Sequence, residues 1–372
     1  MTDLSFAPAA VDVFHLSAPL TAPRQNAFGQ MDRRPCLLVR MRDSAGNEGW
    51  GEGFANWPVF GAAHRKLILS ELLDPAIIGR TYPNPSTMWH DLTQRFHAIA
   101  VQSNEPGPFE QCIAALDIAA WDLVARRADL PLYAVLGNDA GIVTRPYASA
   151  LTGATIDALV PALLDGGWEG FKIKVGFGTA PDTQAVERLR RMVGAGTLML
   201  DANQQWDVEA SLCAASSLAA FDPLWLEEPL PADAPLTDWM SLAAKSDVPL
   251  AAGENIRGAS AFADILPALA WVQPDAIKWG GLSCMDGVAQ DARAAGTGFA
   301  PHYLGGGIGL LATAHMARAT GAKWLEVDVT ENPLRDALID DAVSFDGGQV
   351  HLTDRPGLGT LPDPKVLDYY AV

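Results

Sequence analysis

Long apolar runs are missing from this sequence of 372 residues, since nowhere do about 18 apolar residues follow one another, the length that a membrane-spanning helix needs. The first twenty residues also lack a basic start followed by an apolar stretch, and they carry Asp3 and Asp12. The sequence therefore predicts a cytoplasmic chain without a membrane partner.

Basic residues are scarce. Lys and Arg total 26 against 44 Asp and Glu, so the formal net charge is −18. A surface of this sign repels phosphate backbones and anionic lipid headgroups. Nucleic-acid and membrane-surface partners are therefore not expected, and the expected partner is a small-molecule substrate.

Cysteines are few and far apart, with no CxxC spacing, so neither a zinc cluster nor a disulfide framework is indicated. We expect reduced thiols at Cys36, Cys112, Cys213 and Cys284. Hydrophobic residues make up 49% and charged residues 19% of the chain, which excludes a disordered or fibrous protein. The length permits one large barrel or two domains.

From about Val143 onward, short apolar segments recur about every 25 residues with helical, Ala- and Leu-rich stretches between them, the period of βα units. The predicted strands are Val143–Ser149, Gly170–Val175, Thr197–Asp201, Leu224–Glu227, Pro249–Gly253, Ala276–Trp279, Gly298–Pro301 and Trp324–Val327. The predicted helices include Thr183–Val193, Val208–Ala220, Leu236–Ala244, Ala259–Leu269 and Asp286–Ala295. Eight strands favour a closed parallel barrel ringed by helices. A doubly wound open sheet is the alternative, but no GxGxxG motif opens the first unit.

The part before the barrel has a different pattern. Two extended apolar runs, Cys36–Met41 and Glu48–Gly51, flank the turn Asp43–Asn47 and predict a hairpin. Phe109–Arg127 predicts a helix, with Pro131 as a stop signal. We therefore expect an α+β domain over residues 1–135.

After the eighth strand, Val343–Leu352 predicts another hairpin through Asp346-Gly347-Gly348. The expected organisation is thus an N-terminal α+β capping domain (1–135), a barrel (136–340) and a C-terminal segment (341–372) that returns to the first domain.

Three carboxylates end successive predicted strands. Asp201, Glu227 and Glu254 are separated by 26 and 27 residues (227 − 201 and 254 − 227), one βα unit each. The chemistry of such barrels lies at the carboxyl ends of the strands, where three carboxylates would repel one another without a cation. Oxygen ligands favour Mg²⁺ over zinc. The alternative is three unrelated carboxylates that cap the following helices.

Lysines are also concentrated on the predicted strands, although the chain has only seven. Lys172 and Lys174 are two residues apart, so both side chains project from one face of the second strand. Lys278 lies on the predicted sixth strand. A lysine crowded by another ammonium and a metal ion loses proton affinity and can act as a base. Alternatively, the pair only neutralises Asp201 and Glu227.

A histidine and a carboxylate follow prolines at neighbouring predicted strands. Asp275 comes after Pro274, and His302 comes after Pro301. A histidine oriented by a carboxylate is a common general base or acid. Glu326 on the eighth strand adds a further carboxylate, whose alternative role is an ordinary ion pair.

Together these residues resemble the enolase superfamily, specifically its mandelate racemase subgroup, and the resemblance covers nearly the whole chain. It is carried by Lys172-Ile173-Lys174, Asp201-Ala202-Asn203, Glu227-Glu228-Pro229, Gly253-Glu254-Asn255, Pro274-Asp275, Gly280-Gly281, Pro301-His302 and Trp324-Leu325-Glu326, in the order and spacing of that family. The resemblance implies a modified (β/α)8 fold, a (β/α)7β barrel with an α+β capping domain.

The resemblance also implies roles. Mg²⁺ is expected on Asp201, Glu227 and Glu254. Lys174 is expected as one acid/base and the His302–Asp275 pair as the other, while Lys172 and Glu326 stabilise the enediolate. Muconate lactonizing enzymes and dipeptide epimerases carry a second catalytic lysine where Asp275 stands here.

The function implied is removal of the proton α to a carboxylate, with dehydration of a sugar acid or related hydroxy acid as the main hypothesis. The segments Leu304–Gly309 and Asn332-Pro333-Leu334-Arg335 are similar to sugar-acid members, including galactarolactone cycloisomerases. The alternatives are a racemase or epimerase, a lactone cycloisomerase, a catalytically inactive metal-binding regulatory protein, and an unrelated aldolase-type barrel with a Schiff-base lysine. A homo-oligomer is expected.

Specificity is expected from capping segments around Leu20–Pro35 and Gly51–Gly61, since loops of a second domain close over barrel mouths. In the first segment, Arg24, Arg33 and Arg34 could meet a distal carboxylate. Asn203 and Lys278 complete the predicted substrate-binding set.

Overall fold

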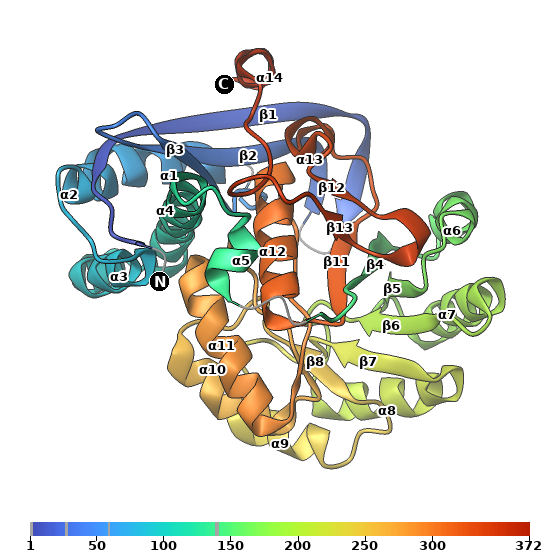
Figure 1. The fold of residues 1–372 in the computed structure, drawn as a ribbon. Helices are drawn as coiled ribbons and strands as arrows, with labels where there is room; N and C mark the ends of the chain where they lie inside the picture. Colours follow the sequence, from blue (N-terminus) through green and yellow to red (C-terminus); the bar gives the residue numbers. More distant parts are fainter. Residues whose placement is uncertain (1–2, 27–28, 59, 138–140) are drawn as a thin grey trace.

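The structure is a computed structural model that describes residues 3–26, 29–58, 60–137 and 141–372, with the backbone alone at residues 24–26. It contains an N-terminal antiparallel sheet with its helices, an eight-stranded parallel sheet ringed by helices, and a C-terminal segment (Figure 1). The predicted α+β cap and barrel are thereby confirmed.

The N-terminal sheet has the order β1 (Pro8–Asn26), β2 (Gly29–Asp43) and β3 (Glu48–Gly53), and its strands are antiparallel. The turn between β2 and β3 forms because Asp43 Oδ1 accepts hydrogen bonds from the N–H groups of Ala45 and Asn47, both at 2.9 Å. The predicted hairpin is therefore present.

Helices pack on this sheet and on one another. They are α1 (Gly61–Ile68), the π-helical turn η1 (Leu69–Leu73), α2 (Asp74–Ile77), α3 (Pro85–Gln102), α4 (Pro106–Arg127) and α5 (Leu132–Leu136). The buried helix α4 lies directly on β3: a Cβ at Gly51 would be 2.0 Å from the Ala115 carbonyl oxygen. The alternate glycines of β3 make this close approach possible, and the residues between them, including Glu52, point to the opposite side.

The barrel strands are all parallel, in the order β10-β9-β8-β7-β6-β5-β4-β11. Their bounds are β4 (Arg145–Leu151), β5 (Gly170–Lys174), β6 (Thr197–Asp201), β7 (Pro223–Glu227), β8 (Leu250–Ala252), β9 (Trp271–Val272), β10 (Gly298–Phe299) and β11 (Trp324–Asp328). β10 and β11 are the two ends of this order, so the barrel is nearly closed.

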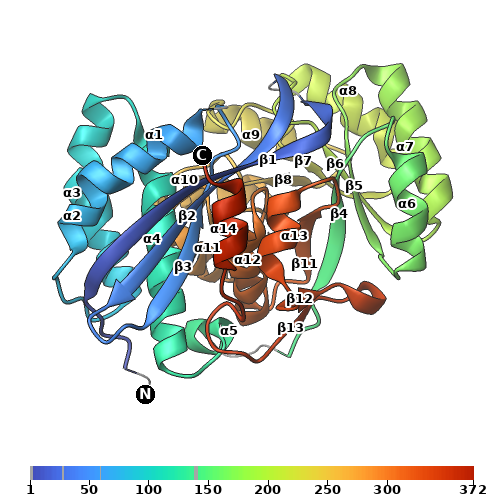
Figure 2. The same ribbon diagram turned by 90° about the horizontal axis from the view of Figure 1, so that it is seen from above.

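Helices cover the outside of these strands (Figure 2). They are α6 (Ile156–Asp165), α7 (Thr179–Val193), α8 (Val208–Leu218) with η2 (Ala219–Phe221), α9 (Leu236–Ala243), α10 (Ala259–Ile265) with η3 (Leu266–Ala268), α11 (Gly281–Ala295), α12 (Gly307–Thr320) and α13 (Pro333–Ile339). The five predicted barrel helices are present. Because the eight strands are parallel, their carboxyl ends all lie at one end of the barrel, which we call the mouth.

The sixth strand was predicted in the wrong place. It is Trp271–Val272, whereas Ala276–Trp279 forms a turn that leads into α11. The turn forms because Asp275 Oδ1 accepts hydrogen bonds from Ile277 N (2.9 Å) and Lys278 N (3.1 Å). Lys278 therefore lies on a loop at the mouth and not on a strand.

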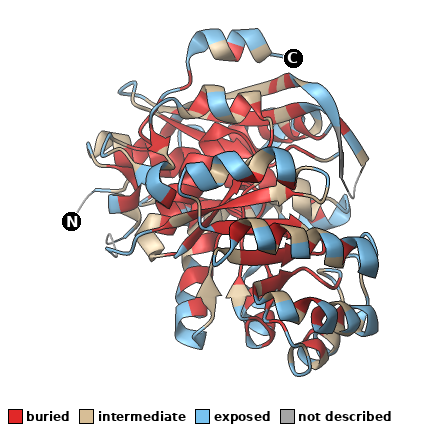
Figure 3. Ribbon diagram, turned by 90° about the vertical axis from the view of Figure 1, so that its right-hand side faces the viewer, coloured by how far each residue is buried: buried red, intermediate tan, exposed pale blue. Residues whose placement is uncertain are grey.

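The barrel interior is filled and buried, whereas exposed residues lie on the outer faces of the helices and in the loops (Figure 3). Fully buried aromatic rings lie under the mouth: Tyr147 and Trp225 meet edge to face, with ring centroids 5.5 Å apart. The Lys172 ammonium lies 5.4 Å from the Tyr147 ring centroid. Among the described residues, no helix combines the length and the apolar character needed to cross a membrane.

The C-terminal segment contains β12 (Val343–Ser344), η4 (Asp346–Gly348), β13 (His351–Leu352) and α14 (Pro364–Tyr370). The predicted hairpin is the antiparallel pair β12 and β13. Beyond it, the Leu358 N–H donates to Asp122 Oδ1 at 2.7 Å and Val372 N–H to the His15 carbonyl at 3.0 Å. The segment thus contacts the N-terminal part, and α14 lies near β1 (Figure 1). The division at residues 135 and 340 stays a prediction.

Candidate active site

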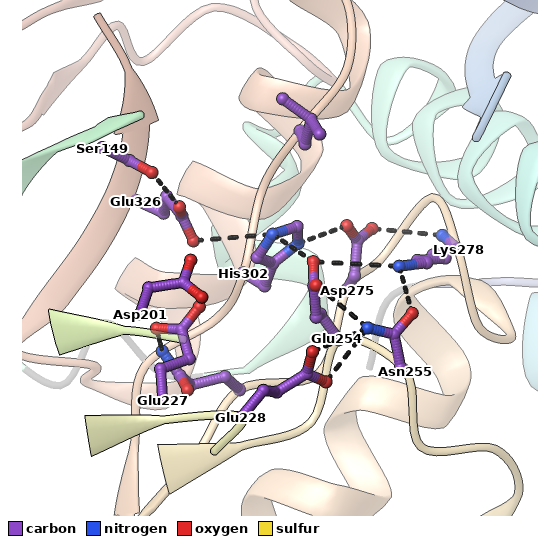
Figure 4. Close-up of polar contacts among 12 residues, drawn as sticks. Ser149, Asp201, Glu227, Glu228, Glu254, Asn255, Asp275, Lys278, His302 and Glu326 are labelled. Carbon is purple, nitrogen blue, oxygen red and sulfur yellow. Dashed lines mark hydrogen bonds and ion pairs between the residues drawn. The ribbon is translucent and has the colours of Figure 1, made fainter. Parts of the chain in front are cut away.

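The predicted functional side chains gather at the carboxyl ends of the barrel strands (Figure 4). Asp201 and Glu227 are the last residues of β6 and β7, and they are paired in register. Glu254 follows β8 by two residues. The remaining members come from β5, from the loops after β9 and β10, and from β11: Lys172, Lys174, Asp275, Lys278, His302 and Glu326. All of these except Lys174 are buried, so their charges face one another in a low-dielectric mouth.

Lys172 is the cation at the bottom of the mouth and is only 1% exposed. Its Nζ lies 2.6 Å from Glu227 Oε1, 2.8 Å from Glu326 Oε1 and 3.7 Å from Asp201 Oδ2. Burial alone would lower the pKa of Lys172, but the carboxylates of Glu227 and Glu326 raise it well above its usual value. The ammonium is therefore a fixed positive charge.

Lys174, two residues further along β5, faces the open part of the mouth. Its Nζ lies 2.5 Å from Asp201 Oδ2 and 2.7 Å from Asn203 Oδ1. Burial would lower the pKa of Lys174, but Asp201 raises it. A lowered pKa was expected for this lysine from its neighbouring ammonium. Among the protein's own groups, Asp201 and Glu254 outweigh Lys172, and the pKa of Lys174 is raised instead.

His302 lies between two carboxylates. Its Nδ1 is 2.7 Å from Asp275 Oδ2, and its Nε2 is 2.6 Å from Glu254 Oε2. Burial would lower the pKa of the imidazole, but Glu254 and Glu326 raise it well above the usual value. Asp275 is itself fixed by the N–H groups of its turn, so His302 is held in one orientation with a proton available.

Glu326 and Glu227 are held by groups that the sequence analysis did not single out. Glu326 accepts a short hydrogen bond from Ser149 Oγ and one of 2.9 Å from the Tyr147 hydroxyl. Glu227 Oε2 accepts from Gln273 Nε2 (2.6 Å) and Trp225 Nε1 (3.1 Å). Burial raises the pKa of Glu227 to about 7, although Lys172 lowers it. Trp225 is two residues before Glu227 on β7, whereas Ser149, Tyr147 and Gln273 are distant from their carboxylates in sequence and meet them only in space.

A second missed group connects Glu254 to Lys278. Asn255 Nδ2 donates to Glu254 Oε1 at 2.9 Å and to both Glu228 oxygens at 3.0 and 2.8 Å, while Asn255 Oδ1 accepts from Lys278 Nζ at 2.6 Å. The Lys278 ammonium lies 5.0 Å from the centroid of the Phe54 ring, which belongs to the cap. Glu228 and Asn255 each follow a predicted metal ligand directly in the sequence, and this adjacency could have identified them as members of the site.

The arginines of the cap are placed differently from the expectation. Arg33 is exposed, and its guanidinium donates to Ser17 Oγ at 2.8 Å and to the Ser17 carbonyl at 2.9 Å. Arg34 is buried and forms an ion pair of 2.7 Å with Asp328. The side chain of Arg24 lies outside the described part of the structure. Neither Arg33 nor Arg34 has a contact with the acid/base groups of the mouth within the part of the chain that the structure describes.

The three strand-end carboxylates share one arrangement. One oxygen of each is held by a neutral donor: Asn203 N for Asp201, Gln273 and Trp225 for Glu227, and Asn255 for Glu254. The other oxygen contacts Lys174, Lys172 or His302 respectively. Such neutral donors orient carboxylates for a metal ion. Across the described residues, however, no three Asp, Glu, His or Cys side chains are already grouped as a metal centre. Carboxylate oxygens are ligands that suit Mg²⁺. In this structure, the oxygens that would bind the metal ion contact Lys174, Lys172 and His302.

Two protein-family models match the chain. The model described as mandelate racemase / muconate lactonizing enzyme, N-terminal domain, matches residues 9–137, and the model described as enolase C-terminal domain-like matches residues 156–366. The two matched ranges correspond to the cap and to most of the barrel with its C-terminal extension.

Relatives of the chain include both dehydratases and a cycloisomerase. It is 26% identical to arabinonate dehydratase of Saccharolobus solfataricus, covering 90% of each chain. It is 29% identical to L-talarate/galactarate dehydratase of Salmonella typhimurium (96% of this chain, 86% of the other). It is 27% identical to D-galactarolactone cycloisomerase of Agrobacterium fabrum (94% and 95%).

Solved structures agree with the fold over the whole chain. A mandelate racemase/muconate lactonizing enzyme from Bordetella bronchiseptica superimposes with a TM-score of 0.90 at 38% identity, covering 99% of this chain and 100% of that one. A racemase from Streptomyces coelicolor with bound magnesium superimposes with a TM-score of 0.85 at 27% identity, covering 98% and 100%.

Proposed function

We propose that this chain, which belongs to the mandelate racemase/muconate lactonizing enzyme family of the enolase superfamily, removes the proton α to the carboxylate of a small acid. The observation that carries the proposal is the placement of two proton carriers across one mouth. Lys174 comes from β5 and His302 from the loop after β10, and the strand order separates them by four strands on one side and two on the other. They can approach an α-carbon from opposite faces.

The remaining groups supply fixed positive charge and hydrogen bonds for the enediolate. Asp201, Glu227 and Glu254 would hold Mg²⁺, which stabilises negative charge on the carboxylate oxygens of a bound acid. Lys172 adds a buried ammonium. Glu326, held by Tyr147 and Ser149, lies beside Lys172. Burial would raise the pKa of Glu326, but Lys172 and His302 lower it, so Glu326 would donate a hydrogen bond to the enediolate only after a proton is transferred to it. Such fixed charges are usually the largest contribution to catalysis because they need no reorganisation during the reaction.

The most favoured outcome is dehydration of a sugar acid. Lys174 would take the α-proton as the neutral amine, a form favoured when Mg²⁺ shares the Asp201 carboxylate that raises the lysine pKa. The His302 imidazolium protonates the hydroxyl on the β-carbon. The C–O bond breaks, water leaves, and the enol that forms tautomerises to a 2-keto acid. Two relatives named as dehydratases of sugar acids support this outcome, and so does the charged state of His302 between Asp275 and Glu254.

A lactone cycloisomerase is the second candidate, supported by the relative named D-galactarolactone cycloisomerase. There, a ring oxygen leaves in place of water. Without a leaving group, reprotonation on the opposite face gives the epimer. A Schiff-base aldolase is disfavoured because the relatives named above are dehydratases, a cycloisomerase and a racemase. An inactive regulatory protein is disfavoured because both proton carriers are present.

A panel of acids in α-carbon epimer pairs tests the proposed function. The panel contains arabinonate with ribonate, galactarate with talarate, and galactarolactone, each with Mg²⁺. We expect a 2-keto acid from at least one sugar acid. Opening of galactarolactone with loss of its ring oxygen supports the cycloisomerase instead, and epimer formation supports the racemase. No turnover and no α-proton exchange on any member contradicts the proposal.

Mg²⁺ dependence gives a separate prediction. EDTA is expected to abolish turnover, and Mg²⁺ or Mn²⁺ to restore it. Replacing Glu254 by Gln is expected to lower Mg²⁺ affinity by at least about tenfold. Loss of a group that only orients a metal ligand already costs about tenfold, and loss of a ligand itself should cost more. Calorimetric titration of the metal measures this affinity. The matched control is Glu48→Gln on the partly exposed cap strand. Unchanged affinity in Glu254→Gln means that the assigned ligand set is wrong.

A further inference from the structure

A buried carboxylate of the cap reaches the barrel loop that carries His302. Glu52, on β3, is 1% exposed. It accepts a short hydrogen bond from Gly306 N and one of 2.8 Å from Gly309 N. Both donors are at the amino end of α12, which starts five residues after His302. A side chain of one domain therefore caps the helix that follows the acid/base group of the other.

The glycine-rich segment after His302 has the shape that this contact requires. A Cβ at Gly305 would lie 2.7 Å from Glu52 Oε1, and a Cβ at Gly306 would lie 3.0 Å from Glu52 Oε2. Helix α12 has no acidic residue in its first turn and no side-chain cap of its own. Burial raises the pKa of Glu52 to about 7, although the N–H groups of Gly306 and Gly309 lower it, so above that pH the carboxylate supplies the negative charge that a helix amino end favours. The absence of side chains at these glycines makes room for the carboxylate.

The end of the same cap strand also contacts the loop that carries Asp275. Phe54 N–H donates to the Ile277 carbonyl at 2.8 Å, and the Ile277 N–H in turn donates to Asp275 Oδ1. Asn56 Nδ2 donates to the Leu304 carbonyl at 3.0 Å, two residues after His302. Residues 52–56 thus hold both loops whose side chains form the His302–Asp275 hydrogen bond.

Helix α4 of the cap makes a similar contact with α11, the helix that follows the Asp275 loop. Asp117, fully buried, accepts hydrogen bonds from Ser283 N at 2.9 Å and Ser283 Oγ at 2.6 Å, at the amino end of α11. Helix α11 follows the Asp275 loop directly. Each of the two loops is therefore followed by a helix whose first turn is held by a carboxylate of the cap.

We propose that Glu52 is a positioning residue for His302, acting through Gly306 and Gly309 to keep the imidazole in register with Asp275. The proposal rests on the proposed acid/base function of His302. Glu52 touches no reacting group, and its effect is transmitted by the loop between His302 and α12. Removing one of the two hydrogen-bond acceptors of Glu52 loosens the first turn of α12 and lets the imidazole leave the position in which Nδ1 meets Asp275.

The test uses the full-length protein without substrate, so that it does not depend on knowing the acid. Glu52→Gln keeps the shape of the side chain but turns one acceptor into a donor that faces an N–H group. Hydrogen exchange at Gly306 and Gly309 is expected to become faster by on the order of tenfold, the effect of one lost hydrogen bond. The imidazole nitrogen chemical shifts of His302, assigned by comparison with His302→Asn, are expected to move. Glu48→Gln, at the other end of β3, is expected to change neither quantity.

Unchanged exchange at both glycines, or unchanged His302 shifts, in folded Glu52→Gln overturns the proposal. If Glu52→Gln does not fold, Glu52→Asp, which keeps the carboxylate but shortens the side chain so that it cannot reach both N–H groups, gives the same two readouts, and unchanged His302 shifts there overturn it equally. A change in both readouts, with no acid of the panel turned over, leaves the positioning role standing and contradicts only the proposed function. The two failures are thus distinguishable.

Discussion

His302→Asn is expected to lower kcat by about 10²- to 10⁴-fold on the acid that turns over best, the usual contribution of a general acid or base. The imidazolium is held by Asp275 at 2.7 Å and Glu254 at 2.6 Å, and asparagine has no titratable proton to deliver to a leaving group. Lys174→Ala is expected to lower kcat by a similar factor because it removes the group that takes the α-proton. KM should change less than kcat in both variants, since neither change removes the Mg²⁺ ligands.

Steady-state kinetics with Mg²⁺ measure these effects, and His351→Asn on the exposed hairpin β13 is the control. Asp275→Asn is expected to give a smaller loss of the same kind, because it keeps the shape of the pair but removes the charge that supports the imidazolium. Near-normal turnover in both Lys174→Ala and His302→Asn would remove the basis for the proton-transfer assignment.

Lys172→Met is expected to lower the free energy of unfolding of the metal-free protein by about 3 kcal/mol, the scale for removing one partner of a buried ion pair. The variant leaves Glu227 and Glu326 without the ammonium that lies 2.6 and 2.8 Å from them. Because Mg²⁺ would neutralise some of the same carboxylates, adding it should recover part of the lost stability. The variant is also expected to lose about 10²-fold or more in kcat, since a fixed charge for the enediolate is gone.

Denaturant unfolding with and without Mg²⁺ measures the stability of this variant, and Lys245→Met, at an exposed position after α9, is the matched control. Equal stability of Lys172→Met and wild type would mean that the Lys172 ammonium does not balance these carboxylates. A loss of stability without any effect of Mg²⁺ would argue against a metal ion at Glu227.

Regular spacing made much of the site predictable. Asp201, Glu227 and Glu254 are each one βα unit apart, so their convergence followed from the barrel alone, and the two-residue spacing of Lys172 and Lys174 placed both on one face. The position of the sixth strand was predicted wrongly because that strand has only two residues, Trp271–Val272, whereas the apolar run after Asp275 is longer. A side-chain-capped turn converted that run into a loop, and such a turn overrides an apolar pattern.

Contacts between distant segments were beyond the reach of the sequence. Glu52 meets Gly306 across 254 residues of chain, and no periodicity connects the two. Arg34 has the charge that could bind a substrate carboxylate, but it forms an ion pair with Asp328, which is 294 residues away in the sequence. The sequence indicates which residue types are available at each strand end, while the docking of the cap on the barrel decides which of them remain free.

Exchange of the α-proton with solvent deuterium tests the central claim most directly. Wild-type protein with Mg²⁺ is incubated in deuterium oxide with the same panel of acids, and NMR follows the α-proton signal of the unreacted acids and their epimers, and the deuterium at C3 of any 2-keto acid that forms. The proposed chemistry predicts loss of the α-proton from at least one acid, by exchange with solvent deuterium or with formation of a 2-keto acid, and retention of that proton when the group facing it, Lys174 or His302, is replaced. Retention of the α-proton in every acid, or exchange that persists without both groups, would contradict it.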